Sequence, residues 1–130
     1  MTGEEFIEEL SYTEYSYEIV GGKINVTTGD EGGDFIMYLP SIPPDVIFSN
    51  PGYVELNYID NVPSGAEFNN KGHVFLDSVT VIEKGVYFNN DGGVYLKSIF
   101  NGWSDYCDFN IDDIDSKRLL NLMIKQGLFI

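Results

Sequence analysis

The amino-acid sequence predicts a mainly β fold, a short β-solenoid of 20-residue coils with a short N-terminal helix cap and a C-terminal helix cap. Three observations lead to this prediction: an internal repeat, strand-like alternation inside each repeat, and helix-like segments outside the repeats. Residues 65–79 (GAEFNNKGHVFLDSV) and 85–99 (GVYFNNDGGVYLKSI) agree at 8 of 15 positions. Residues 45–59 (DVIFSNPGYVELNYI) share Phe, Asn, Gly, Val and Leu with residues 65–79 at the same offset of 20.

The first predicted element is a short helix near the N-terminus. Thr2 followed three residues later by Glu5 resembles a capping box, and Phe6, Ile7 and Leu10 would form one apolar face. We expect residues 1–32 to form an N-terminal cap within a single domain that comprises residues 1–130.

Residues 33–110 are predicted to form the coils. The Val-x-Leu motif of each copy alternates as a strand with one buried face does, and a second short strand fits residues 46–48, 66–68 and 86–88. Glycines and prolines between them supply turns. A 20-residue unit cannot bury its own apolar face, so the coils must stack at about 4.8 Å per rung, in an LRR-like or β-helix-like solenoid. Equivalent positions would then form columns: Phe48/Phe68/Phe88, Asn50/Asn70/Asn90, Gly52/Gly72/Gly92, Val54/Val74/Val94 and Leu56/Leu76/Leu96.

The ends of this array are irregular. Residues 33–48 form a degenerate earlier copy, which aligns only with a slip of about one residue, and Phe109 and Asn110 echo the pattern once more. Residues 111–130 are expected to form a helical cap. Asp115 or Ser116 would begin a helix that runs through Gln126, with an apolar face formed by Leu119, Leu120, Met123 and Ile124. Such caps cover terminal rungs that would otherwise pair edge to edge.

The chain is strongly acidic but also rich in apolar residues. Its 21 acidic and 7 basic side chains give a net charge of −14, while 43% of the residues are hydrophobic and 15% aromatic. This composition favours a folded domain over a disordered acidic tail. The charge argues against direct binding to nucleic acid or to an anionic membrane, and it favours a basic partner. No signal-peptide pattern and no apolar run of about 18 residues is present, so we expect a cytoplasmic protein without a membrane span.

The sequence offers little for catalysis or for a cofactor. His73 and Cys107 lie on different elements, and no Gly-x-Ser-x-Gly motif or phosphate loop occurs. An EF-hand loop that starts at Asp108 fails, because Asp113 stands at the glycine position and Leu119 at the bidentate position. We therefore expect no enzyme activity, no metal and no cofactor.

The repeats and the tail resemble a known group of proteins. The strings FNNKGHVFLDSV and FNNDGGVYLKSI, with the tail IDSKRLLNLMI at residues 114–124, resemble small phage and prophage proteins with PEGVxFNNGGxVxLxSL-type repeats and a similar tail. The resemblance covers residues 45–130, with fewer prolines and a degraded first repeat. That family has no established activity, so the resemblance implies a solenoid of mobile-element origin, located in the host cytoplasm, and transfers no catalytic residue.

The negative charge is concentrated in the two segments that flank the coils. Residues 1–18 contain six Glu and no basic residue, and residues 104–115 contain five Asp and no basic residue. We expect a non-enzymatic inhibitor that binds a basic host protein or nucleoprotein complex, of the anti-CRISPR or anti-restriction type, with nucleic-acid mimicry as one mode of binding. The candidate binding residues are the acids Glu4, Glu5, Glu8, Glu9, Asp105, Asp108, Asp112 and Asp113, with the aromatic anchors Tyr53, Phe75 and Tyr95.

Two alternatives remain open from the sequence. One is a structural or assembly module that forms homo-oligomers through its solenoid. The other is a small carbohydrate-binding module, in which Phe75 and Tyr95 would stack on a sugar.

Overall fold

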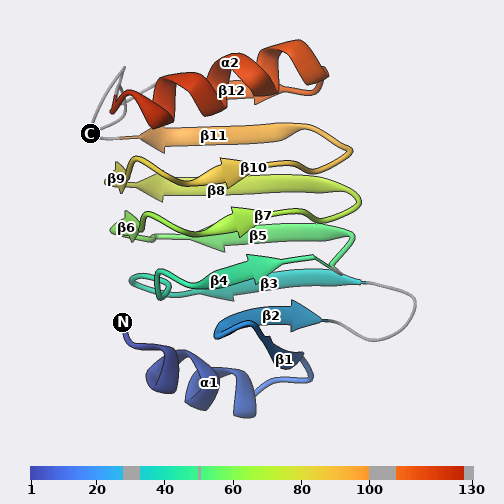
Figure 1. Cartoon of the computed structure of the whole chain (residues 1–130), viewed down its shortest axis with the longest axis vertical. Coiled ribbons are helices and arrows are strands. Elements are labelled where there is room, and N and C mark those ends of the chain that lie inside the picture. The colour runs from blue at the N-terminus through green and yellow to red at the C-terminus, as the bar shows by residue number, and fades with distance from the viewer. Residues whose placement is uncertain (28–32, 50, 100–107, 128–130) are drawn as a thin grey trace.

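The computed structural model describes residues 1–27, 33–49, 51–99 and 108–127, and it confirms a mainly β solenoid with a helix at each end (Figure 1). Successive coils lie above one another along the long axis of the molecule. In chain order the elements are α1 (Gly3–Ser11), β1 (Ser16–Val20), β2 (Lys23–Thr27), β3 (Asp34–Tyr38), β4 (Val46–Phe48), β5 (Tyr53–Asn57), β6 (Asn61–Val62), β7 (Glu67–Phe68), β8 (His73–Val79), β9 (Val81–Ile82), β10 (Tyr87–Phe88), β11 (Val94–Ile99), β12 (Asp108–Ile111) and α2 (Ile114–Lys125).

The longer strands of the coils form one sheet, the long-strand sheet, in the order β12-β11-β8-β5-β3. From β3 to β11 its strands run parallel, and Val54, Val74 and Val94 stand in one register column. Phe35 pairs with Val54 at an offset of 19 residues, which is the one-residue slip expected for the degenerate first copy. The period of the sequence is therefore the period of the stack.

The shorter strands form a second sheet, the short-strand sheet, in the order β1-β2-β4-β7-β10, and β6 pairs with β9 at a third side. β2 pairs in parallel with β4, so stacking in this sheet begins before residue 33. β1 is antiparallel to β2 and forms a hairpin with it through Gly21 and Gly22, both at positive φ. This two-glycine turn is the conformation that a tight hairpin requires.

The interior is built from columns of like side chains. The rings of Phe48 and Phe68 stack with centroids 5.1 Å apart, and those of Phe68 and Phe88 with centroids 4.9 Å apart. All three rings are buried, as are the Val and Leu columns of the long-strand sheet. Each coil therefore buries its apolar face against its neighbours, because it has too few residues to form a core alone.

The repeated Asn and Gly residues shape one corner of the coil. Asn90 Nδ2 donates to the carbonyl oxygens of Gly92 (2.7 Å) and of Gly72 in the coil below (3.1 Å). The glycine backbones approach so closely that a Cβ on Gly72 would lie 1.7 Å from the carbonyl oxygen of Gly52. Both columns thus have structural roles, as the sequence indicated.

The N-terminal cap consists of α1 and the β1–β2 hairpin. The capping box is confirmed: Thr2 Oγ1 accepts from Glu5 N, and Glu5 Oε1 accepts from Thr2 N, each at 3.1 Å. Phe6 and Leu10 are buried against the first coil. Between α1 and β1, the Tyr15 hydroxyl accepts from Ile36 N (3.0 Å) and donates to Ile36 O (3.3 Å). One hydroxyl therefore satisfies the outer backbone groups of Ile36 on the terminal strand β3.

At the other end, the N-cap of α2 lies two residues before Asp115 and three before Ser116, the two residues expected to cap the helix. Its N-cap is Asp113, whose carboxylate accepts from Ser116 N (2.8 Å) and Ser116 Oγ (2.7 Å). The expected apolar face was partly wrong, because Leu119 is exposed and Lys117 takes a buried position one helical turn before Leu120. Lys117 faces the last coil because its ammonium group donates to backbone carbonyl oxygens of Asn90 and Gly92 there.

Candidate interaction surface

The N-terminal acidic residues lie on the exposed side of α1. Glu4, Glu5, Glu8 and Glu9 are all exposed, while Phe6 and Leu10 attach the helix to the first coil. The carboxylates are therefore held on a folded element at one end of the stack.

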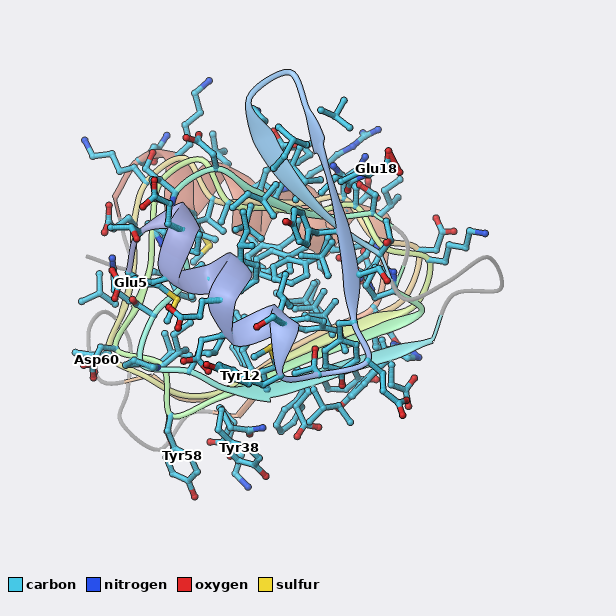
Figure 2. The ribbon with its side chains drawn as sticks, turned by 90° about the horizontal axis from the view of Figure 1, so that it is seen from below. Glu5, Tyr12, Glu18, Tyr38, Tyr58 and Asp60 are labelled. Carbon is cyan, nitrogen blue, oxygen red and sulfur yellow. The ribbon has the colours of Figure 1, made fainter. Side chains whose placement is uncertain are left out.

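Glu5 has a structural role in addition to its charge. The bond from the backbone N–H of Thr2, followed by the Thr2 side chain, holds the pKa of the Glu5 carboxyl below its usual value. Figure 2, which looks at the N-terminal end of the stack, places Glu5 on the side of α1 away from the β1–β2 hairpin. Glu4 lies closer to the hairpin, since it precedes by three residues Ile7, which lines the groove on that side, and Glu8 lies between Glu4 and Glu5 on the outermost face of the helix.

The C-terminal acidic cluster is less uniform than the sequence indicated. Asp105 lies outside the described residues, and Asp108 lies in β12, in register with Lys97 of β11. Asp112 and Asp113 are exposed, but Asp113 caps α2, and its bonds from Ser116 N and then Ser116 Oγ lower its pKa. The same end carries the exposed cations Arg118 and Lys125, so its described surface has mixed charge.

The aromatic candidates lie on the outer face of the long-strand sheet, and they are half-buried. The Tyr53 hydroxyl donates to Glu55 Oε1 at 2.7 Å, and Asn57 Nδ2 donates to Glu55 Oε2 at 2.8 Å. Burial and the bond to Glu55 raise the pKa of the Tyr53 hydroxyl well above its usual range. The rings of Phe75 and Tyr95 are 6.5 Å apart in adjacent strands. The structure therefore brings the three aromatics onto one face, separate from α1.

Residues that the sequence did not single out are more exposed. Tyr12, Tyr38 and Tyr58 are each about 70% exposed or more, and the rings of Tyr38 and Tyr58 stack at 6.1 Å. Both rings project from one flank of the solenoid (Figure 2). Their separation of 20 residues, the period of the repeat, is the available sequence signal, and the slip of the first copy pairs Tyr38 with Asn57, the residue before Tyr58.

A second feature missed from the sequence is the groove between α1 and β1. It has a volume of about 300 Å³ and is lined by Ile7, Leu10, Ser11, Tyr15, Ser16 and Tyr17. Every residue of β1 is exposed, including Tyr17, Ile19 (55%) and Val20 (52%). The alternating sequence SYEIV could have indicated a strand, but not that the strand would lie outside the core. The acidic helix therefore borders a groove with both apolar and hydroxyl side chains and a strand with exposed apolar residues.

The described residues present no metal site or membrane helix. They contain no group of three or more His, Cys, Asp or Glu side chains arranged to hold a metal ion. His73, which the sequence places on a solvent-facing position, is exposed, and its Nδ1 accepts from Gly93 N at 2.8 Å in the next coil. Neither α1 nor α2, the two described helices, is long and apolar enough to cross a membrane.

Comparisons with protein-family models, with curated proteins and with solved structures give no match. The geometry of the surface must therefore carry the functional argument.

Proposed function

We propose that this protein is a non-enzymatic interaction protein that binds a basic surface of a partner through its N-terminal end. The observation that carries the proposal is the coincidence of acidic and apolar groups there. Six Glu and no basic residue occur in residues 1–18, and the exposed apolar side chains of β1 lie beside them. Charge supplies long-range attraction and selectivity, and apolar contact supplies affinity once the surfaces meet.

The cap is organised before a partner arrives. The capping box fixes the first turn of α1, Phe6 and Leu10 anchor the helix, and the bonds of Tyr15 to Ile36 tie the connection to β3. A surface whose charges are already in place loses less conformational entropy on binding than a flexible acidic tail does. This supports binding over a role for the charge in solubility alone.

The partner class that we propose is a nucleic-acid-binding defence complex of the host, with this protein acting as a phage-encoded inhibitor in the host cytoplasm. Ordered carboxylates on a narrow rigid body suit a basic groove that otherwise holds phosphates. The repeats and the tail, which resemble phage proteins, favour this class over an unrelated basic protein.

The assembly alternative is less favoured, because side chains cover two of the strand edges that a further coil would extend. The Tyr15 hydroxyl bonds the outer backbone groups of β3, and the Asn121 amide bonds those of β10. The carbohydrate alternative is less favoured because the Tyr53 hydroxyl and the Asn57 amide are both bonded to Glu55.

The test is a pull-down from bacterial lysate followed by a competition assay. The double variant Glu4→Lys/Glu8→Lys should lose the partner that the wild-type chain retains at low salt. The control Asp60→Lys/Asp91→Lys makes the same change in net charge at exposed sites outside the N-terminal cap, and it should retain the partner. The recovered partner should bind nucleic acid, and the wild-type chain should displace that nucleic acid. Equal loss in both variants would reduce the effect to net charge, and retention in both would refute the proposal.

A further inference from the structure

The outer edge of β1 is an open strand edge. β1 pairs with β2 on one side through five residue pairs, and no described residue pairs with its other side. Two other terminal strands of the stack are covered, since β3 carries the Tyr15 hydroxyl and β10 carries the Asn121 amide. β1 thus presents an open edge together with exposed apolar side chains.

Hairpin geometry indicates which backbone groups face outward. In a two-residue hairpin the pair that flanks the turn, here Val20 and Lys23, is hydrogen bonded, and bonded and non-bonded pairs alternate from there. Tyr17 and Ile19 then belong to non-bonded pairs, opposite Val26 and Ile24. Their N–H and C=O groups are expected to point away from β2. Four backbone groups therefore form a template for one more strand.

The side chains at this edge indicate what the added strand should contain. Tyr17 and Ile19 lie on the same face of the hairpin as the buried Val26 and Ile24, and Tyr17 lines the groove beside α1. A strand placed next to β1 would point alternate residues into this groove, where apolar residues fit. Its other residues would pass Glu18 on the opposite face of β1, where basic residues fit.

Pairing of β1 with β1 of a second copy is disfavoured by charge. A symmetric pair would bring two N-terminal segments together, each with six Glu and no basic residue. Like charges across neighbouring strands are destabilising. The same charge attracts a basic segment.

From these observations we infer that β1 and the groove beside α1 bind an extended segment of alternating basic and apolar residues, which adds to the short-strand sheet as a parallel or antiparallel edge strand. This inference rests on the proposed function and identifies the recognised element as a basic β-strand of the partner. Backbone pairing would supply affinity, and the acids around the edge would supply selectivity.

The experiment measures binding of two labelled peptides of equal charge by fluorescence anisotropy at low salt. One alternates lysine with valine, and the other alternates lysine with proline, which removes strand donors and extended pairing. We expect the lysine–valine peptide to bind at least about tenfold tighter, as expected for the loss of one or two backbone hydrogen bonds. An alternating glutamate–valine peptide should not bind.

Variants of β1 and α1 make the test specific to this edge. Ile19→Pro removes an N–H that is expected to face outward, so the hairpin should persist while the preference for the lysine–valine peptide is lost. The control Ile19→Thr keeps the N–H and should retain the preference. Glu8→Lys, three residues before the groove-lining Ser11, should weaken the peptide severalfold more than Glu9→Lys, which is farther from the groove around the helix.

Hydrogen exchange of the wild-type chain supplies a measurement that does not depend on the folding of Ile19→Pro. The amides of Tyr17 and Ile19 should become protected on addition of the lysine–valine peptide. Equal affinity of the lysine–valine and lysine–proline peptides, or no protection of these amides, would overturn strand addition while leaving the proposed acidic surface intact. Failure of both lysine peptides to bind would count against both proposals. Dimerisation of the free chain through β1 would also overturn the inference.

Discussion

The side-chain amide of Asn121 forms with Phe88 the pair of hydrogen bonds that a neighbouring strand would form. Its Nδ2 donates to the carbonyl oxygen of Phe88 at 2.9 Å, and its Oδ1 accepts from the backbone N–H of Phe88 at 2.9 Å. A residue of α2 therefore takes the place of the next coil at the end of the short-strand sheet. Tyr15 does the same for Ile36 at the opposite end of the long-strand sheet.

The two ends of the solenoid thus follow one plan. At each end, one sheet is continued by an antiparallel strand, β1 on β2 and β12 on β11, and the other sheet is closed by a side chain. A solenoid without such closure presents strand edges that invite association. In this plan the outer edges of β1 and β12 have no strand beside them among the described residues, and the residues of β1 are exposed.

Replacement of Asn121 should open the edge of β10. In Asn121→Ala both backbone groups of Phe88 lose their partner, so we expect the free energy of unfolding to fall by about 1–3 kcal/mol. Light scattering should also show greater self-association with rising concentration. Urea denaturation gives the first quantity, with Asn89→Ala, an exposed residue just after β10, as the control. Equal midpoints for the two variants would show that Asn121 does not close the sheet.

Lys117 closes the asparagine corner in a similar way. Its ammonium group is buried and donates to the carbonyl oxygens of Asn90 and of Gly92, the latter at 3.1 Å. The Lys117 bond to Gly92 O is equivalent to the bond that the Asn90 amide donates to Gly72 O one coil earlier. The ammonium group therefore takes the place that the asparagine of a further coil would occupy. Two polar residues of the tail IDSKRLLNLMI, Lys117 and Asn121, therefore have structural roles, because both bond to the last coil.

Substitution of Lys117 by methionine keeps the length of the side chain and removes its donors. The carbonyl oxygens of Asn90 and Gly92 then lose a bond in a buried place, and we expect a loss of about 1–3 kcal/mol in the free energy of unfolding. Lys125→Met removes the same charge from an exposed position of α2 and should change stability by less than about 0.5 kcal/mol. A stability of Lys117→Met equal to that of Lys125→Met would contradict this role.

The repeat explains why so much of this fold could be predicted. Phe48, Phe68 and Phe88 recur every 20 residues, and a fixed period fixes the stacking partner of each residue. The caps have no such period. Lys117 is buried and Leu119 is exposed because the last coil leaves carbonyl oxygens without a strand partner, which Lys117 can reach. The apolar pattern of a helix does not indicate where those carbonyl oxygens lie.

The candidate surface was predictable only as charge. Glu4 and Glu8 stand out in the sequence by the absence of neighbouring bases, but the groove beside α1 requires the hairpin to fold back next to the helix. Glu5 and Asp113 were selected as binding residues although they are also capping residues. A carboxylate at a helix start serves both purposes with the same sequence signature.

The glycine column gives a prediction with a control inside the same column. A Cβ on Gly72 would lie 1.7 Å from Gly52 O, so Gly72→Ala must displace backbone and should cost at least about 2 kcal/mol of unfolding free energy. Gly52 stands at the equivalent place one coil earlier, where the nearest atom to a Cβ is Gly33 O at 3.9 Å. Gly52→Ala should therefore stay within about 0.5 kcal/mol of the wild type. Urea denaturation of both variants measures their free energies of unfolding. Similar losses in the two variants would mean that the coils adjust their spacing to accept a methyl group.

Acid should weaken the two helix caps. The folded-state pKa values of Glu5 and Asp113 are lowered from their ordinary values of 4.5 and 3.8, because each carboxylate accepts a backbone N–H bond. A depressed pKa contributes stability that is complete above the ordinary value and is lost as the pH falls through the folded value. The double variant Glu5→Gln/Asp113→Asn should therefore lose less unfolding free energy than the wild type between about pH 5 and pH 2. Urea midpoints across this range measure the difference. The control Glu9→Gln/Asp112→Asn removes the same charge from neighbouring exposed positions, which accounts for general charge repulsion. If both double variants showed the same acid dependence, the effect would come from net charge and not from the caps.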